Sequence, residues 1–416
     1  MAPVIQISPK RSSFIDDLDE FLVQGLQPEI LYRIELILFH KTKFIANAFF
    51  VSDENGVIDL SKEAPLFGFY KGVDKMGLFT ALYQDPLERF GSKLNLSPVP
   101  ETLNYKISVH IIEERDSVAD CEIERVIWPE NIQRTALEHQ RLDGVIFSPK
   151  DPEICPLPCI LDLSGVGGIK EHRACFLAQS GYLVLSLALY GKSEKLPKRH
   201  EDVNTEYILE AIDYLTSLRN ATEQVILIGT SLGGTWAYHA ATRSNKVKAA
   251  ISINGQGGYY FVSQIKENGK RLPWTPLTPE ALSQVEIENG CVSYAKMYEA
   301  CEAEEKHKIP LESLNSHQNL FYIASEWDKA IPALQQCKWI EERMKNAGKS
   351  DSFNFEIASK GSHMLDVPFM PICDVTYVAG KFLLFGGDPY ISGCEQRRIW
   401  PKILEFIKKN FEEIKQ

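Results

Sequence analysis

Apolar and polar residues alternate along the first third of the chain. In residues 31–39 (LYRIELILF), Ile34, Leu36 and Leu38 occupy every second position, and this period of two predicts a half-buried strand. A similar pattern of apolar and polar residues occurs in the segments KFIANAFFVS, YKISVHIIEE and CEIERVIW, and turn-forming residues separate them. Short strands joined by turns predict an Ig-like antiparallel β-sandwich, which we place at residues 1–135.

After residue 135 the apolar residues form continuous runs instead. These runs are PCILDLSG, YLVLSLAL, QVILIG, KAAISING, NLFYIAS and FNFEIAS. They alternate with amphipathic helical stretches such as residues 205–220 and 397–414. Strands buried on both faces and joined by helices predict a mostly parallel α/β sheet over residues 136–416. Residues 258–316 break the alternation, which predicts an inserted lid.

Composition and charge narrow the class of protein. The chain has 416 residues, of which 44% are apolar and 24% charged, as in ordinary globular proteins. Its net charge of −11 argues against a general nucleic-acid binder. No apolar run approaches the roughly 20 residues that span a bilayer, so we expect no stable membrane insertion.

Nine cysteines are scattered along the chain, which shows no signal-peptide pattern. We therefore expect reduced thiols. Cys155 and Cys159 lie closest together, but no second pair of ligands has zinc-site spacing, so no metal site is predicted.

Residues 229–233 read Gly-Thr-Ser-Leu-Gly, a G-x-S-x-G pattern between an apolar run and an Ala-rich helical stretch. The pentapeptide alone is weak evidence for a nucleophile, because it occurs readily by chance and could equally be a structural turn. Its strand–turn–helix context is that of a nucleophile elbow. The glycines would allow a strained serine backbone and close passage of the helix past the strand. We therefore predict Ser231 as a nucleophile.

An elbow requires an acid and then a histidine further along the chain. His363 directly follows the run FNFEIAS on a Gly-Ser loop, whereas we expect His239 to pack inside the elbow helix. Asp328 follows the run NLFYIAS at the turn into a helix, and Glu326 is the alternative acid. The acid would accept the His363 Nδ1–H bond and stabilise the imidazolium that forms when Ser231 loses its proton. This order predicts an α/β-hydrolase domain.

Acyl transfer to a serine also needs an oxyanion hole. One expected donor is the backbone N–H of Leu232, directly after the nucleophile. The other should come from Val166 or Gly167 in the loop SGVGG, which follows the run PCILDL. A phosphate cradle is the alternative for this loop, but the spacing matches neither G-x-G-x-x-G nor a P-loop.

Several segments together resemble the family of type I acyl-CoA thioesterases and bile acid-CoA:amino acid N-acyltransferases, over nearly the whole chain. They are GFYKGVDKMGLF, ILDLSGVGGIKEHRACFLAQSGYLVLSLALY, IGTSLGG, IPLESLNSHQNLFYIASEWDKAIPA, GSHMLDVPFMPIC and FLLFGGDPYISGCEQRRIWPKILEFIKKNF. The resemblance implies the triad Ser231, Asp328 and His363. The chain departs from the family at Lys75, where proline is usual, and at Trp327, where many members have a second acid.

The resemblance also implies the chemistry. Thioesterases of this family carry serine as nucleophile and the amino acid-conjugating enzymes carry cysteine. Amines attack an acyl-thioenzyme readily, whereas water activated by histidine resolves an acyl-serine ester. Ser231 therefore favours hydrolysis of an acyl-CoA substrate to a free acid and CoA-SH, with no cofactor or metal because CoA is the leaving group. The alternatives are N-acyl transfer to glycine or taurine, a carboxylesterase, and an inactive hydrolase-fold binding module.

Two further expectations concern the lid and the compartment. Lys266, Lys270 and Arg271 could meet the CoA phosphates, although a solvated charged loop is the ordinary interpretation of such residues. Residues 414–416, Ile-Lys-Gln, do not form a peroxisomal signal, and together with the missing signal peptide this favours the cytoplasm.

Overall fold

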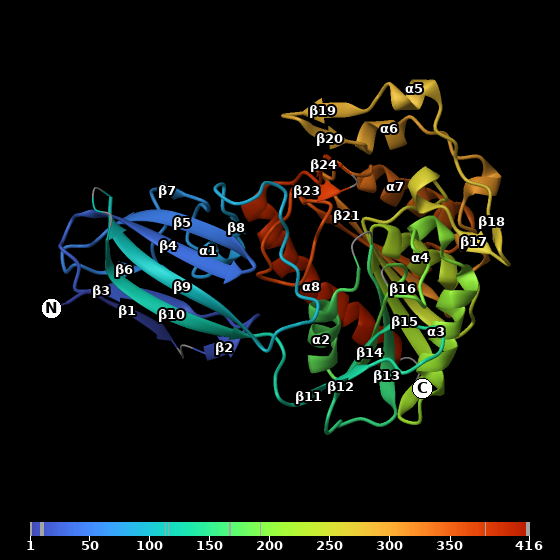
Figure 1. The fold of residues 1–416 in the computed structure, drawn as a ribbon, viewed down its shortest axis with the longest axis horizontal. Helices are drawn as coiled ribbons and strands as arrows, with labels where there is room; N and C mark the ends of the chain where they lie inside the picture. The colour runs from blue at the N-terminus through green and yellow to red at the C-terminus, as the bar shows by residue number, and fades with distance from the viewer. Residues whose placement is uncertain are drawn as a thin grey trace.

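The computed structural model describes residues 2–8, 12–112, 114, 116–165, 168–191, 193–378 and 380–412. The chain forms two parts that lie side by side (Figure 1): a mostly β N-terminal part, and a second part in which helices surround a large sheet. This two-part arrangement agrees with the sequence analysis. The sheet of the second part begins at Ile132, and a domain boundary between residues 135 and 136 remains a prediction.

The N-terminal part contains two sheets. The smaller sheet has the order β1-β3-β6, and the larger has the order β2-β10-β9-β4-β5-β7, with β8 also pairing with β5. Their bounds are β1 (Val4–Ser8), β2 (Ser12–Phe14), β3 (Glu20–Gln24), β4 (Leu31–His40), β5 (Thr42–Val51), β6 (Ile58–Asp59), β7 (Phe67–Gly68), β8 (Tyr83–Gln84), β9 (Thr102–Ile111) and β10 (Ser117–Val126). All pairs are antiparallel except β2 with β10.

Strand β4 has the predicted alternation of buried and partly exposed residues. Tyr32, Ile34, Leu36 and Leu38 are buried, and the residues between them are only partly covered. Side chains of both sheets belong to one buried apolar cluster. The structure thus has the predicted half-buried strand, while the Ig-like classification of this part remains a prediction.

The second part is built on an eight-stranded sheet with the order β11-β12-β14-β13-β15-β16-β21-β22. The strands are β11 (Ile132–Ala136), β12 (Gly144–Pro149), β13 (Leu157–Leu163), β14 (Leu183–Leu187), β15 (Ala221–Thr230), β16 (Val247–Ile253), β21 (Asn319–Ser325) and β22 (Phe353–Ala358). From β14 to β22 every neighbouring pair is parallel. The two remaining pairs of this sheet, β11 with β12 and β12 with β14, are antiparallel.

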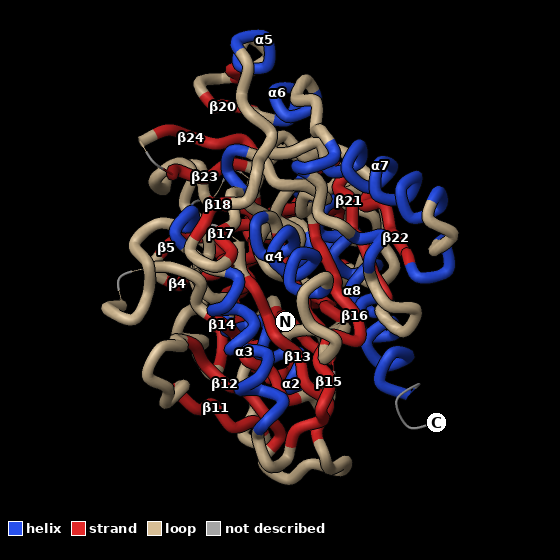
Figure 2. Tube along the Cα trace, turned by 90° about the vertical axis from the view of Figure 1, so that its right-hand side faces the viewer, coloured by secondary structure: helices blue, strands red, loops and turns tan. Residues whose placement is uncertain are grey.

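Helices cover both faces of this sheet. The helices α2 (Glu171–Gln179) and α8 (Pro389–Glu412) pack on one face, and α3 (Thr205–Ser217), α4 (Leu232–Ala241) and α7 (Ala333–Asn346) pack on the other. Figure 2 shows α3 and α4 in front of the strands. Successive residues of β15 divide between the faces: Ile226 and Ile228 pack with α2 and α8, while Val225 and Leu227 pack with α3 and α4. Burial on both faces explains the continuous apolar runs.

The segment between β16 and β21 interrupts the regular order, as the sequence predicted. It contains η2 (Phe261–Ser263), β17 (Lys266–Glu267), β18 (Lys270–Arg271), α5 (Pro279–Leu282), β19 (Glu286–Glu288), β20 (Cys291–Ser293), α6 (Ala295–Glu299), η3 (Glu305–His307) and η4 (Leu311–Ser313). The hairpin β19–β20 joins β24 (Lys381–Leu384) and β23 (Val375–Val378) in a separate four-stranded sheet. A lid function for this segment remains a prediction.

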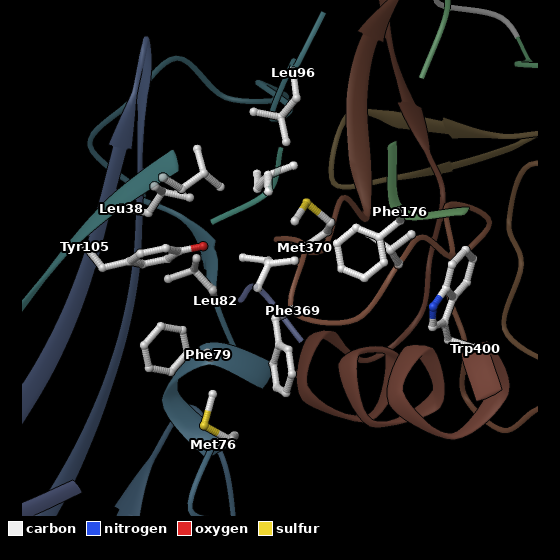
Figure 3. Close-up of a cluster of buried hydrophobic side chains, with 14 of the residues drawn as sticks. Leu38, Met76, Phe79, Leu82, Leu96, Tyr105, Phe176, Phe369, Met370 and Trp400 are labelled. Carbon is white, nitrogen blue, oxygen red and sulfur yellow. The ribbon is translucent and has the colours of Figure 1, made fainter. Parts of the chain in front are cut away.

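The two parts share one buried core. Figure 3 shows Leu38, Phe79, Leu82 and Tyr105 of the N-terminal part facing Phe369 and Met370, with Phe176 and Trp400 beyond them. Phe369 and Met370 belong to the loop that contains His363. The N-terminal part therefore packs directly against the loop that carries the predicted catalytic histidine.

The segment GFYKGVDKMGLF (residues 68–79) and the next residue, Thr80, make a second contact between the parts, with helix α8. Arg397 Nη1 donates hydrogen bonds to Asp74 Oδ2 at 2.7 Å and to Thr80 Oγ1 at 3.0 Å. The backbones also approach closely, because a Cβ atom on Gly393 would lie 2.1 Å from the backbone oxygen of Thr80. Helix α8 has no room for a side chain at this position.

This close approach predicts that Gly393→Ala destabilises the protein. Inside a helix, exchange of glycine for alanine normally stabilises by about 1 kcal/mol. Here the added methyl must push Thr80 away, and we expect a loss of about 1–3 kcal/mol in the free energy of unfolding. Urea unfolding should show the loss, whereas Glu405→Ala, at an exposed position of the same helix, should change stability by less than about 0.5 kcal/mol. A Gly393→Ala protein as stable as the parent would contradict the contact.

Candidate active site

Ser231 is the single residue between the end of β15 and the start of α4. Its φ of 56° and ψ of −124° lie in a region that residues other than glycine rarely adopt. Its backbone N–H donates to the Ile253 oxygen at 2.8 Å, and its own oxygen accepts from Gly234 N at 2.9 Å and Thr235 N at 3.1 Å. These bonds hold the serine in a strained turn, as expected for a nucleophile elbow.

The two glycines of the pentapeptide make this turn possible. A Cβ atom on Gly229 would lie 2.1 Å from the backbone oxygen of Gly233. A Cβ atom on Gly233 would lie 2.0 Å from the backbone oxygen of Leu163, at the end of β13. Real Cβ atoms are not found this close to backbone oxygens, so any other residue would separate α4 from the strands and shift Ser231.

Asp328 and His363 form a buried pair. Asp328 follows β21, His363 follows β22, and His363 Nδ1 lies 2.6 Å from Asp328 Oδ2. Both side chains are at least 97% covered. The second carboxylate oxygen of Asp328 accepts the backbone N–H groups of Ala330 at 2.8 Å and Ile331 at 3.0 Å. The carboxylate is thus fixed by backbone N–H groups of the turn just before α7 and directed at the imidazole.

The alternative acid, Glu326, has other partners. Its Oε2 atom accepts from the backbone N–H of Lys360 at 3.1 Å and from Ser359 Oγ at 3.2 Å. The side chain is exposed. Of the two candidate acids, the structure places Asp328 against the histidine.

Two other residues singled out in the sequence have partners elsewhere. His239 is buried in α4 with ring nitrogens 2.8 Å from Thr205 Oγ1 and 2.9 Å from the Tyr259 hydroxyl, and burial lowers its pKa to about 3. Lys266 pairs with Asp202 at 2.6 Å. His239 therefore has a packing role in the structure, as expected, and Lys266 forms a local ion pair.

The predicted oxyanion loop begins beside the serine. A Cβ atom on Gly165 would lie 3.1 Å from Ser231 Cβ, so the loop after β13 passes against the nucleophile position. Leu232 is the first residue of α4, where backbone N–H groups have no partner within the helix. Val166 and Gly167 lie outside the described residues.

A buried ion pair lies beneath the elbow, and the sequence analysis did not identify it. Arg173 of α2 donates from Nε to Asp162 Oδ2 of β13 at 2.9 Å and from Nη1 to Thr230 Oγ1 at 2.6 Å. Arg173 and Asp162 are completely buried. Burial alone would lower the pKa of the Arg173 guanidinium, but the Asp162 carboxylate raises it, so the guanidinium remains charged. Thr230 directly precedes Ser231, and the pair therefore ties the strained turn to α2.

A second charged contact joins the histidine loop to the start of α2. Asp366, three residues after His363, accepts from Lys170 Nζ at 2.7 Å and lies 3.0 Å from His172 Nε2. Burial opposes the negative charge, yet the cationic Lys170 holds the pKa of the carboxyl well below its usual range. Lys170 follows the predicted oxyanion loop, so this pair connects that loop with the histidine loop.

In the described part of the chain, no group of three or more His, Cys, Asp or Glu residues is arranged to hold a metal ion. No disulfide joins the cysteines of the residues that the structure describes. None of the helices in these described ranges is long and apolar enough to cross a membrane.

The fold and the strained serine define a class of protein. A serine between a parallel strand and the following helix, with an aspartate and then a histidine after later strands of the same sheet, is the arrangement of α/β-hydrolases. The family within this class follows from the sequence. The chain belongs to the BAAT / acyl-CoA thioester hydrolase family: the model of the family's C-terminal region matches residues 203–413, and that of its N-terminal region matches residues 20–139.

Curated relatives include enzymes of two kinds. Mouse acyl-coenzyme A amino acid N-acyltransferase 2 is 27% identical over 97% of both chains. Human acyl-coenzyme A thioesterase 1 is 27% identical over 99% of this chain and 97% of its own. Human acyl-coenzyme A thioesterase 2, named as mitochondrial, is also 27% identical, over 99% of this chain and 85% of its own. A cytoplasmic location therefore remains a prediction.

Solved structures that resemble the chain are more distant. An α/β-hydrolase enzyme from a deep-sea metagenome library has a TM-score of 0.42 and 16% identity, over 68% of this chain and 98% of its own. Esterase B from Lactobacillus rhamnosis has a TM-score of 0.42 and 11% identity, over 69% of this chain and 88% of its own.

The buried pair beneath the elbow predicts a coupled effect on stability. Arg173→Met leaves the Asp162 carboxylate buried without its partner, and we expect a loss of about 3–5 kcal/mol in the free energy of unfolding. Combining it with Asp162→Leu should recover a large part of that loss, since the uncompensated charge is gone. Denaturant unfolding of the single and double variants measures both effects.

The control for the Arg173 and Asp162 variants is an exposed ion pair. Lys246 and Asp213 pair at 2.7 Å with side chains 46% and 66% exposed, so Lys246→Met should cost less than about 1 kcal/mol. Equal effects at the buried and the exposed pair would contradict the role assigned to Arg173.

Proposed function

We propose that the protein hydrolyses acyl-CoA thioesters to a free acid and CoA-SH through an acyl-serine intermediate. The observation that carries the proposal is Ser231 in its strained turn, in a chain that belongs to the BAAT / acyl-CoA thioester hydrolase family. In this proposal Ser231 is the nucleophile, His363 the general base and acid, and Asp328 the carboxylate that orients the histidine. No bound cofactor takes part.

The first half of the reaction acylates the serine. Ser231 Oγ attacks the thioester carbonyl carbon while His363 Nε2 takes the hydroxyl proton. Asp328 accepts the Nδ1–H bond, which fixes the tautomer and stabilises the imidazolium. When the tetrahedral intermediate collapses, the carbon–sulfur bond breaks and the imidazolium gives its proton to the departing CoA sulfur.

Water completes the turnover. His363 takes a proton from a water molecule as its oxygen attacks the acyl-serine ester, and the proton then returns to Ser231 Oγ as the acid leaves. In both halves the oxyanion would accept hydrogen bonds from Leu232 N–H and from a backbone N–H of residues 166–167. A single donor of this kind typically stabilises the transition state by about 3 kcal/mol.

The insertion at residues 258–316 is proposed to cover the site as a lid. Its Ser293 Oγ and Tyr294 N both donate to the backbone oxygen of Lys329, the residue after Asp328, at 2.9 and 3.0 Å. The hairpin β19–β20 is therefore attached next to the proposed acid. Lys270 and Arg271 are exposed in the same segment, which is compatible with contacts to the CoA phosphates.

N-acyl transfer to an amino acid is the second candidate. The mouse N-acyltransferase is as similar to this chain as the human thioesterase, so overall identity does not separate the two activities. The nucleophile favours hydrolysis, because an acyl-serine ester is less readily attacked by amines than an acyl-thioenzyme. A carboxylesterase and an inactive binding module have less support, since the family and the Asp328–His363 pair favour a thioester-cleaving enzyme.

Replacing the nucleophile should abolish thioester cleavage. In Ser231→Ala we expect kcat for thiol release to fall by about 10⁴-fold or more, and in His363→Ala by a similar factor, because triad members act as a unit. A thiol-reactive dye with acyl-CoA as substrate measures the rate. Ser359→Ala removes an exposed hydroxyl and should leave the rate unchanged. Activity that survives in Ser231→Ala would overturn the assignment of the nucleophile.

The acyl acceptor can be tested separately. With glycine or taurine present, we expect an unchanged rate of thiol release and free acid as the main product, both followed by mass spectrometry. Ser231→Cys should raise the amide fraction, because the acyl-thioenzyme is more open to amines. Amide as the main product of the unaltered protein would replace the hydrolase proposal by the transferase.

A further inference from the structure

We propose that Asn254 is the positioning residue that holds the acid loop and the histidine loop in register with the nucleophile elbow. This inference rests on the proposed function of the same site. Asn254 directly follows β16, is completely buried and has a φ of 50°. Asn254 belongs neither to the G-x-S-x-G pattern nor to the proposed triad.

The amide of Asn254 bridges the two loops. Its Nδ2 group donates to the backbone oxygen of His363 at 2.8 Å and lies 3.3 Å from that of Ser362. The same group donates to Ser325 Oγ at 2.9 Å, and Asn254 Oδ1 accepts from Ser325 N at 2.8 Å. Ser325 ends β21, three residues before Asp328. One side chain thus holds the backbones of both loops.

Ser325 closes this network. Its hydroxyl donates to the Ser362 oxygen at 2.7 Å, so the acid loop and the histidine loop are also joined directly. The hydroxyl is the acceptor for Asn254 and the donor to Ser362, and its single proton serves only one bond. The hydrogen bonds of the network are therefore mutually consistent.

The backbone on either side of Asn254 reaches the elbow. The oxygen of Ile253 accepts the Ser231 N–H at 2.8 Å. On the other side, a Cβ atom on Gly255 would lie 2.9 Å from the carbonyl carbon of Gly234 in α4. The backbone of residues 253–255 therefore contacts the elbow. The Asn254 side-chain amide contacts the acid loop and the histidine loop.

Asparagine suits this position for two reasons. Its left-handed conformation is one that asparagine tolerates better than most side chains. Its amide supplies donors to backbone oxygens and an acceptor to a backbone N–H, whereas the carboxylate of aspartate would face the oxygens of Ser362 and His363 with no donor. Catalytic groups must be held within about 0.5 Å of the productive geometry, so loss of this bridge should affect the rate.

The test uses Asn254→Gly, which keeps the left-handed backbone accessible and removes only the amide. We expect kcat for thiol release to fall about 10–100-fold while KM stays within about threefold, since a displacement of 1 Å can cost this much. The rate of Ser231 phosphonylation by a fluorophosphonate should fall by a similar factor. Lys41→Gly, at φ 63° in the exposed turn between β4 and β5, is the matched control and should keep both rates.

A residue that only supports the fold would give a different result. In that case Asn254→Gly would lower the unfolding midpoint but keep kcat and the phosphonylation rate within twofold at a temperature where it is folded, and this would overturn the inference. If Asn254→Gly does not fold, Ser325→Ala provides the test, because it removes the hydroxyl that links Asn254 to Ser362. We expect a three- to tenfold loss of both rates there, and unchanged rates would also overturn the inference.

Phosphonylation separates this inference from the proposed function. The reaction needs the serine and histidine in place but neither CoA nor an acyl acceptor. If the unaltered protein makes amide rather than acid, the hydrolase proposal fails while the phosphonylation rates still decide the role of Asn254. A parent protein whose Ser231 does not react would overturn both.

Discussion

One steric constraint underlies the site: the backbone around Ser231 has no room for side chains at the two neighbouring glycines. A Cβ atom on Gly229 would lie 2.1 Å from the oxygen of Gly233, and a Cβ atom on Gly233 would lie 2.0 Å from the oxygen of Leu163. Only this close packing lets α4 start at once after β15, with the serine held at a positive φ between them. The serine is thereby fixed at the strand end, beside Gly165 of the loop that follows β13.

Buried polar contacts connect this fixed turn to the other elements of the site. Arg173 and Asp162 hold the residue before the serine, and Lys170 and Asp366 join the histidine loop to the start of α2. The same loop continues into Phe369, which packs in the core shared with the N-terminal part. The N-terminal part therefore supports the site through apolar packing against the histidine loop.

Local pattern and chain order are enough to predict a serine in a strand–turn–helix and the contact between Asp328 and His363. Ends of neighbouring parallel strands meet at one edge of a sheet, so the order serine, aspartate, histidine already indicates a shared location. The role of Asn254 cannot be predicted in this way, because an Asn-Gly pair after a strand is an ordinary turn signal. The hydrogen bonds of its side-chain amide depend on loops far along the chain. Asp162 left a detectable signal: a lone carboxylate within a strand buried on both faces requires a partner. The parallel pairing of β2 with β10 has no local signal, since alternation predicts strands but not their neighbours.

Asp328 and His363 already lie together as a buried pair, so the group that receives the acyl chain decides the mechanism. Acid quenching of the protein during turnover of a saturated acyl-CoA, followed by peptide mass spectrometry, identifies this group. We expect a single acyl group on the peptide that contains Ser231, formed before free acid accumulates. An acyl group on another residue, such as the exposed Cys155, or turnover without any acyl-enzyme would contradict it.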